Sequence, residues 1–570
     1  MRYRVSARSG GATQSLRQRR EATQSRHLAA YLSSVGLAGE ARLAARMSVS
    51  EHARAKLLEL VRRSGNLPVP GSLDQVRALI RLYFGGARDL IYRDLRLGGG
   101  PMAMAVFLDT IVDDELLERS LKGFIDPSQP VQLQEATCGA AEYVRLRLAS
   151  SPDATATPHI DQAAQWIAEG RTLLFIAGSN QALAINLPGG PMRSVEESKT
   201  ERVMRGPREG FVESIQVNTT LVRRRIRDPR LRVDEVQVGE ISHTRVAVMY
   251  IATICKQSLV DEVKQRIRRV KIDGMLDSGQ LMEFIEDTPW TMFPLIRATE
   301  RPDVVAGALL EGRCAVVVEG SPYVLVAPAS ILDLIHTPED YYERFPAVFL
   351  VRLLRILFAL VSLFGPSLYV AMTTFHREMI PTNLLLSIMV AREGVPFPAV
   401  LEALMMELVF EIIREAGVRM PTQLGQSISI VGALILGESA IRAGIVSAPL
   451  IITVAITGLA SLMLPDVSTS LALRILRFPM LVLAGTYGVY GLTLGGVAIL
   501  MHLLSLRSFG APYMAPFGPL LPADGDDTVV RKPHWAQIRR PATIEQLDTR
   551  RAVRGLKPHP GPRRDGGSST

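Results

Sequence analysis

The chain has 570 residues, a formal net charge of +9 and 47% hydrophobic residues, which is too long for one ordinary core and predicts two or more units. Its three cysteines, Cys138, Cys255 and Cys314, form no CxxC pair, which argues against a disulfide framework or a zinc site and favours buried thiols. Neither basic flank interleaves aromatic residues with base-reading groups, so we expect no nucleic-acid partner.

Residues 1–75 predict a basic N-terminal extension with a helical prefix. The first part is rich in arginine and serine but has no apolar run before a cleavage site, so it is not a secretory signal, although its composition would also suit a transit peptide. From Ala29 to Val61, apolar and polar residues alternate at roughly helical spacing. The stretch NLPVPGS then predicts a linker.

Two stretches, 76–192 and 193–345, each mix apolar strand-like runs with helical patterns. In the first, PMAMAVFLDTIVD and TLLFIAGSNQALAINLP predict strands. In the second, TRVAVMYIATI and CAVVVEGSPYVLVAP predict strands, whereas an arginine-rich run, FVESIQVNTTLVRRRIRD, predicts a helix. Strands alternating with helices predict two α/β subdomains. We favour a solvated cytoplasmic surface for the many arginines over a docking surface.

Residues 346–506 predict an α-helical polytopic membrane domain. The run AVFLVRLLRILFALVSLFGPSLYVAMTT can cross a hydrocarbon layer of about 30 Å, and its Arg352 and Arg355 are expected to reach back to the headgroups. The run LLLSIMVA is too short to span, so it predicts an interfacial or re-entrant segment. After it comes an opening helix, VPFPAVLEALMMELVFEIIREAG, and three further candidate spans.

The basic residues near the membrane segments predict that both ends of the domain lie on the cytoplasmic side. If both ends lie on the same side, the number of spans must be even. Counting the opening helix gives five spans and leaving it out gives four, so this criterion favours four. Residues 507–570 predict a basic cytoplasmic tail that is largely disordered.

The opening helix carries an unusual set of carboxylates. Glu407, Glu411 and Glu415 follow i, i+4 and i+8 and share one face, from which Glu402 is offset. Because a lone carboxylate at the bilayer centre costs about 2.5 to 3.5 kcal/mol, the face must meet water, an arginine such as Arg414, or another subunit. Three interpretations remain open: an amphipathic helix at the cytoplasmic interface or packed on the hairpin, the lining of a hydrated cavity, and a proton relay.

The next helix carries a stripe that ends in an acid and a base: Ser427, Val431, Leu434, Glu438 and Arg442. Glu438 and Arg442 could instead pair at i, i+4 near the membrane surface. A second face of small residues suits close helix packing. Candidate pore or cavity-lining residues across the two helices are Ser427, Val431, Leu434, Glu438, Glu407 and Glu411.

No catalytic, cofactor-binding or metal-binding constellation is expected, and the chain is not predicted to be an enzyme. Its GGP turns lack the strand and helix context of a nucleotide-binding loop. The histidines are isolated, and His336 precedes the predicted helix start TPEDYYERF rather than forming a ligand site.

Several unusual strings occur in a fixed order. They include RSVEESKTERVMRGPREGFVES, FIEDTPWTMFP, TERPDVVAGALLEGR, TTFHREMIPTNLL, AREGVPFPAVLEALMMEL, GQSISIVGALILGESAIRAGIVS and LRSFGAPYMAP. Together they resemble the A subunit of the GerA-type spore germination receptors. The resemblance covers about Leu173 to Pro516, and leaves out Leu28 to Val61 and the tail after Pro522.

The resemblance implies a multi-pass protein of the spore inner membrane with a large cytoplasmic N-terminal region of two α/β subdomains. It also implies a transporter-like B subunit, which binds the nutrient, and a lipoprotein C subunit as partners. The A subunit would form a homo-oligomer that conducts monovalent cations and so starts germination. Two alternatives remain: a sibling in the dipicolinate-release system, and a non-conducting scaffold or signalling subunit.

A compact charged motif is expected to join the cytoplasmic subdomains or dock them to neighbours, as a buried ion-pair joint. Its members are Arg205, Pro207, Arg208 and Glu209. The chain departs from the family pattern at Ser198, where proline is common, and at Glu438 and Ser439, where glutamine and alanine are common. The departures at 438 and 439 bear on ion selectivity more than on fold.

Overall fold

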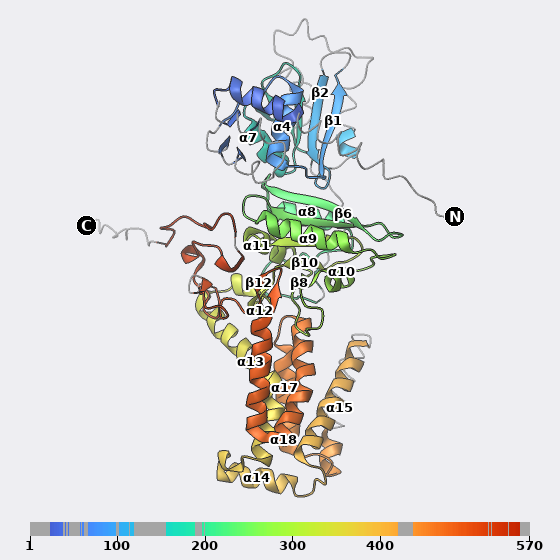
Figure 1. Cartoon of the computed structure of the whole chain (residues 1–570), viewed down its shortest axis with the longest axis vertical. Coiled ribbons are helices and arrows are strands. Elements are labelled where there is room, and N and C mark those ends of the chain that lie inside the picture. The colour runs from blue at the N-terminus through green and yellow to red at the C-terminus, as the bar shows by residue number, and fades with distance from the viewer. Residues whose placement is uncertain are drawn as a thin grey trace, which may run out of the picture.

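The computed structural model contains two α/β units and a helical part, and the C-terminal segment folds back beside the second unit (Figure 1). The structure describes residues 23–37, 66–97, 102–112, 155–187, 200–419, 437–521, 527–544 and 546–558, with short pieces between them. The predicted helix AAEYVRLRLAS lies outside the described residues, as does Cys138.

The first unit is a five-stranded antiparallel sheet with helices packed on one face and a short helical piece, 115–118, beside the other. Its strands follow the order β1-β2-β4-β5-β3. Its elements are α4 (Leu73–Phe84), β1 (Leu90–Arg96), β2 (Met102–Leu108), β3 (Thr155–Thr157), α7 (Ile160–Ala168), β4 (Thr172–Ile176) and β5 (Ala182–Ile185). Successive strand residues point to opposite faces, so β2 supplies Met104 and Val106 to one core and Ala105 and Phe107 to the other.

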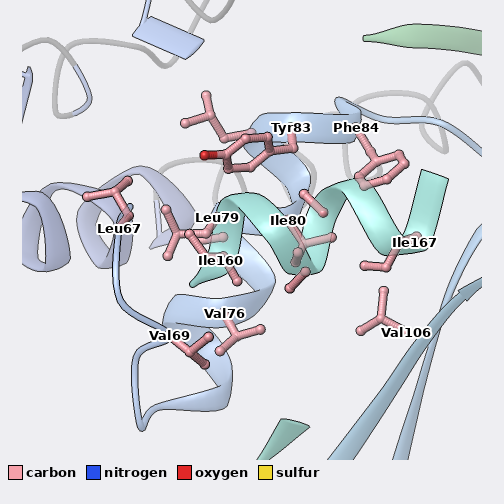
Figure 2. Close-up of a cluster of buried hydrophobic side chains, with 14 of the residues drawn as sticks. Leu67, Val69, Val76, Leu79, Ile80, Tyr83, Phe84, Val106, Ile160 and Ile167 are labelled. Atoms are coloured by element: carbon pink, nitrogen blue, oxygen red, sulfur yellow. The ribbon is translucent and has the colours of Figure 1, made fainter. Parts of the chain in front are cut away.

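The N-terminal prefix belongs to the core of the first unit. Figure 2 shows Leu79 and Ile80 of α4 close to Ile160 of α7, with Leu67 and Val69 nearby. The prefix residues are buried in the same cluster: Leu28, Tyr31, Leu32, Leu57, Leu58 and Val61. The predicted linker is therefore packed rather than free, because its apolar residues complete the surface beside α4 and α7.

The second unit repeats the strand topology of the first and has helices on both faces of its sheet. Its strand order is β6-β7-β9-β10-β8, again wholly antiparallel. Its elements are α8 (Ile215–Arg225), β6 (Leu231–Val238), β7 (Thr244–Ile251), α9 (Gln257–Arg269), α10 (Ser278–Ile285), β8 (Arg297–Thr299), α11 (Pro302–Leu310), β9 (Cys314–Val318), β10 (Val324–Ala327) and α12 (Ile331–Ile335). The predicted α/β class is confirmed in both units, and Cys255 and Cys314 are buried free thiols.

The two units are structural duplicates of one another. The strands β1 to β5 correspond in order to β6 to β10, and α4 and α7 correspond to α8 and α11. Sequence traces remain, because Glu169–Arg171 and Glu311–Arg313 both read EGR before the fourth strand. The central glycines, Gly170 and Gly312, have φ values of 96° and 94°, which favour glycine at both turns.

A buried ion pair joins the two units. Arg223 of α8 donates through Nη2 to Asp89 Oδ1 over 3.0 Å, and the two side chains are 1% and 7% exposed. Thr220 Oγ1 donates to the carbonyl of Thr110 over 2.6 Å, and Arg232 Nη1 donates to that of Tyr83 over 2.7 Å. The sequence predicted a solvated surface for the arginine-rich part of the second unit. Arg223 and Arg232 are instead buried, and they join the two units.

The helical part begins at α13 (Phe345–Thr374), and α14 (Thr382–Arg392) lies across its far end (Figure 1). It continues with α15 (Ala399–Arg419), a helical piece at 437–442, α17 (Ala448–Leu462) and α18 (Val467–Ser505). By length and composition, α13 and α18 could each cross a membrane. The helix α14 is too short to do so, as the sequence predicted.

The α18 segment is two antiparallel legs rather than one span. The break is at Gly488, whose φ of 62° is non-helical. A Cβ on Gly495 would lie 2.6 Å from Met480 Sδ, although a straight helix would separate the two residues by about 22 Å. Predicting this segment as one span was therefore wrong. The sequence left a choice between four spans and five, the fifth being the opening helix. Because α18 contributes two legs instead of one, the count that includes the opening helix becomes six. The requirement for an even number of spans therefore no longer favours leaving that helix out.

The C-terminal segment differs from the largely disordered tail that the sequence predicted. Ser508 Oγ donates to the carbonyl of Leu295 over 2.6 Å, and Leu547 donates its N–H to the carbonyl of Ile254 over 2.9 Å. Arg540 Nε donates to the carbonyl of Leu310 over 2.7 Å. The segment's arginines and backbone groups find partners on the second unit, which their composition alone does not reveal.

Glu286, after α10, predicts a pH-dependent stability. Burial, the largest cause, and the charges of Glu283 and Asp287 raise the pKa of Glu286 to about 7. The hydrogen bond donated by the N–H of Leu295 opposes this rise. Folding therefore favours the protonated carboxyl, and this contribution is lost as pH rises through about 7. We expect Glu286→Gln to raise the melting temperature of the full chain in detergent at pH 8 and to leave it near wild type at pH 4. Equal shifts at both pH values would contradict this.

Candidate functional site

The carboxylates of α15 meet arginines of α18 inside the helical part. Glu407 Oε2 accepts a hydrogen bond from Arg477 Nη1 over 2.5 Å, and the side chains are 3% and 2% exposed. Arg477 also donates to Ser362 of α13, through Nε to its carbonyl over 2.8 Å and through Nη2 to its Oγ over 3.1 Å. A single guanidinium thus connects α13, α15 and the first leg of α18.

A second ion pair lies one turn along the same face. Arg474 Nη1 donates to Glu411 Oε1 over 2.8 Å, and Arg414 pairs with the same oxygen. Glu411 is one-third exposed, whereas Arg474 is buried. The charge on this face of α15 is therefore balanced from within the helical part, at both Glu407 and Glu411.

Glu402 forms a third buried site where α17 begins. Its Oε1 accepts hydrogen bonds from both the N–H and the Oγ of Ser447, each over 2.6 Å. Its side chain is fully buried, and Arg392 Nε approaches its Oε2 to 3.5 Å. The carboxylate thereby caps the N-terminus of α17, where the helix dipole favours negative charge.

The sequence predicted the carboxylate face but not its main partners. Arg414 was named as a possible partner and does pair with Glu411, whereas Arg474 and Arg477 were missed. Their signal was available, since LALRILRFPM places two arginines at i and i+3 in an apolar run. Buried charges in such a run need partners of opposite sign from another helix.

The predicted pore residues are not brought together by the described structure. Ser427, Val431 and Leu434 lie outside the described residues. Glu438 pairs with Arg442 over 2.5 Å at i, i+4, and their side chains are 56% and 78% exposed. Glu438 therefore does not share the buried surroundings of Glu407.

The Arg205–Glu209 motif lies on the surface of the second unit. Arg205 is 65% exposed and lies 3.5 Å from Glu343. Arg208 is 71% exposed and lies 3.9 Å from Glu197. Glu209 pairs with Arg225 over 2.6 Å, and the carbonyl of Pro207 accepts from Arg301. This is not the buried joint that was expected, because the joint between the units is formed by Arg223 and Asp89.

Arg352 and Arg355, at the start of α13, turn into the protein rather than toward headgroups. Asp340 accepts from Arg352 Nε over 3.1 Å and from Arg355 Nη2 over 2.9 Å. Burial opposes the charge of Asp340, but hydrogen bonding with Arg355 and the two positive charges outweigh it and hold the pKa of Asp340 below its usual value. The junction between the second unit and the helical part is thus a compact ionic cluster.

Comparison with known proteins places the chain in a family. The sequence model of a family described as Bacillus/Clostridium GerA spore germination protein matches residues 78–543. Spore germination protein KA of Bacillus subtilis (strain 168) is 41% identical over 478 residues, which cover 84% of this chain and 87% of that protein. The chain belongs to the GerA family. The match begins well before Leu173 and ends beyond Pro516, so the resemblance was drawn too narrowly.

Other relatives of this GerA-family chain match over comparable lengths. Spore germination protein GerLA of Bacillus cereus is 36% identical, over 85% of this chain and 98% of that protein. An uncharacterized membrane protein of Bacillus subtilis (strain 168), YfkQ, is 39% identical, over 86% and 96%. The crystal structure of the N-terminal domain of the A subunit of the Bacillus megaterium spore germinant receptor GerK3 aligns with 46% of the chain, at 27% identity and a TM-score of 0.37.

Proposed function

We propose that the chain is the A-type subunit of a nutrient germinant receptor and that, as a homo-oligomer, it forms a gated path for monovalent cations. It would reside in the spore inner membrane as a multi-pass protein, with both α/β units in the cytoplasm. Its partners would be a transporter-like B subunit, which binds the nutrient, and a lipoprotein C subunit. Family membership supports the receptor role, and two of the relatives, KA and GerLA, are named as spore germination proteins.

The buried pair between Arg477 and Glu407 is the observation that carries the gating proposal. It joins three helices in apolar surroundings, where an unpaired charge is strongly disfavoured. In the proposed gate these helices would switch between two arrangements, paired and separated, because packed interfaces are bistable rather than continuously deformable. A partner that pulled α15 from α18 would expose a carboxylate able to attract a cation.

The route from the cytoplasmic units to this pair is continuous. The ionic cluster at Asp340 fixes the start of α13, and Ser362 of the same helix accepts two hydrogen bonds from Arg477. A rotation of α13 would therefore act on the pair directly. The Arg205–Glu209 motif, exposed on the second unit, would contact a neighbouring subunit.

The test is cation flux through vesicles that contain the chain together with its partner subunits. We expect nutrient-dependent efflux of potassium, and we expect Glu438→Gln to change its rate or its selectivity, because this exposed carboxylate would lie beside the path. A receptor that binds its partners and its nutrient but passes no ion would overturn the channel and leave the non-conducting scaffold. Neutralisation of Glu407 and Glu411 by arginines is the observation that favours the scaffold.

A further inference from the structure

The C-terminal segment contacts the second unit at a site with a counterpart on the first. In the first unit, the edge where β1 begins and β2 ends receives α8 of the second unit. Asp89 pairs there with Arg223, and the carbonyl of Thr110 accepts from Thr220. This edge is how the first unit holds its neighbour.

The same edge of the second unit has a matching backbone. Asp109 donates its N–H to the carbonyl of Asp89 in the first unit, as Ala252 does to that of Arg230 in the second. Ile111 and Ile254 occupy corresponding places after the second strand, each donating its N–H to the last residue of that strand. Duplication has therefore given the second unit an equivalent docking edge.

The chain's own C-terminal segment occupies that second edge. Leu547 donates its N–H to the carbonyl of Ile254, and Arg540 Nε donates to that of Leu310. A Cβ on Gly312 would lie 2.7 Å from Gln546 Cγ, so the two segments are in tight contact. Charge is reversed relative to the first unit, since Arg230 stands where Asp89 does; its ion-pair partner is Asp228, over 2.7 Å, and Asp548 of the segment adds only a weaker attraction.

The same segment completes the ionic cluster at the start of α13. Asp527 Oδ1 accepts from Arg352 Nη1 over 2.8 Å, and the carbonyl of Thr528 accepts from the same nitrogen over 2.7 Å. Asp340 alone would face two arginines, Arg352 and Arg355, both buried. Asp527 supplies Arg352 with a second carboxylate only when the segment is docked, and the segment also brings the buried Arg531 close to the same charges.

We propose that the described residues between 524 and 551 form a latch, which binds the docking edge of the second unit at one end and the base of α13 at the other, and thereby sets how readily the helical part responds. This inference rests on the proposed receptor function. A latch that bridges a cytoplasmic unit and the first membrane helix restrains their relative rotation. Releasing the latch would change how the helical part responds while leaving every membrane helix in place.

Hydrogen exchange on the full chain in nanodiscs tests the coupling between the two ends. We expect Asp527→Asn to speed exchange of the amides of 546–551, although the hydrogen bonds and the ion pair of the Asp527 side chain go to Tyr341 and Arg352. Asp527→Glu should restore protection. Glu240→Gln, on the exposed turn between β6 and β7, is the matched control and should change nothing. Unchanged protection at 546–551 in Asp527→Asn would overturn the latch.

A double-mutant cycle separates the latch from simple misfolding. Arg352→Gln and Asp527→Asn should each shift the nutrient concentration that gives half-maximal germination of spores, at equal protein level, and together no more than either alone. Additive shifts, or none, would overturn the proposal. Deleting the gene distinguishes failure of the receptor proposal from failure of the latch. If deletion leaves germination unchanged, the receptor function is wrong. If deletion abolishes germination but both variants behave as wild type, only the latch is rejected.

Discussion

Glu407→Gln is expected to lower the stability of the helical part by about 3 to 5 kcal/mol, the range found when one partner of a buried ion pair is removed. The substitution keeps the shape of the side chain but leaves the charge of Arg477 uncompensated among α13, α15 and α18. Thermal unfolding of the full chain in detergent measures the loss. Reduced protein in membranes of the producing cells should accompany it.

Two further variants show whether the loss comes from the unpaired charge. Glu438→Gln breaks an exposed pair at i, i+4, so it should cost less than about 1 kcal/mol. Replacing Glu407 and Arg477 together by leucine removes both charges and should recover most of the stability. Equal losses for Glu407→Gln and Glu438→Gln would contradict the buried pair.

Gly488→Val is expected to prevent the helical part from assembling. At φ 62° a β-branched residue is strained, and a Cβ there would lie 2.8 Å from His376 and 2.9 Å from Phe375. Without the reversal, the second leg of α18 could not return to the second unit, where His502 meets Thr291. Size-exclusion chromatography in detergent should show aggregated or absent protein.

The matched control is Gly496→Ala, in the second leg of the same hairpin. Its added Cβ would lie 3.4 Å from Phe364, an ordinary contact, and a helical alanine is favoured over glycine. The variant should remain monodisperse. A stable, monodisperse Gly488→Val protein would show that the turn does not require glycine and would argue against the two-leg description of α18.

Local patterns in the sequence predicted the elements well. The runs TRVAVMYIATI and CAVVVEGSPYVLVAP become β7 and the pair β9 and β10, and the arginine-rich run becomes α8. Helical and strand periodicity depends on neighbouring residues, so a single sequence contains it. Strand order does not follow from such patterns, and the duplication of the two units emerged only from the sheet topology.

The candidate site was only half predictable for the same reason. The face with Glu407 and Glu411 follows from spacing, but Arg477 lies 70 residues further along the chain and its partner is set by helix packing. The reversal at Gly488 was hidden because GTYGVYGLTLGG carries no charge and resembles part of a continuous span. The C-terminal segment docks through hydrogen bonds to backbone carbonyls of the second unit. The amino-acid composition of the segment does not reveal such bonds.

Potassium release from spores is the most direct test of the proposed function. The variant to compare is the double replacement of Glu407 and Arg477 by leucine, produced with the partner subunits in spores that lack other receptors of this family. We predict wild-type protein levels but little or no potassium release on adding nutrient, because the stable apolar pair can neither separate nor attract a cation. Release at the wild-type rate would contradict a gating role for this pair.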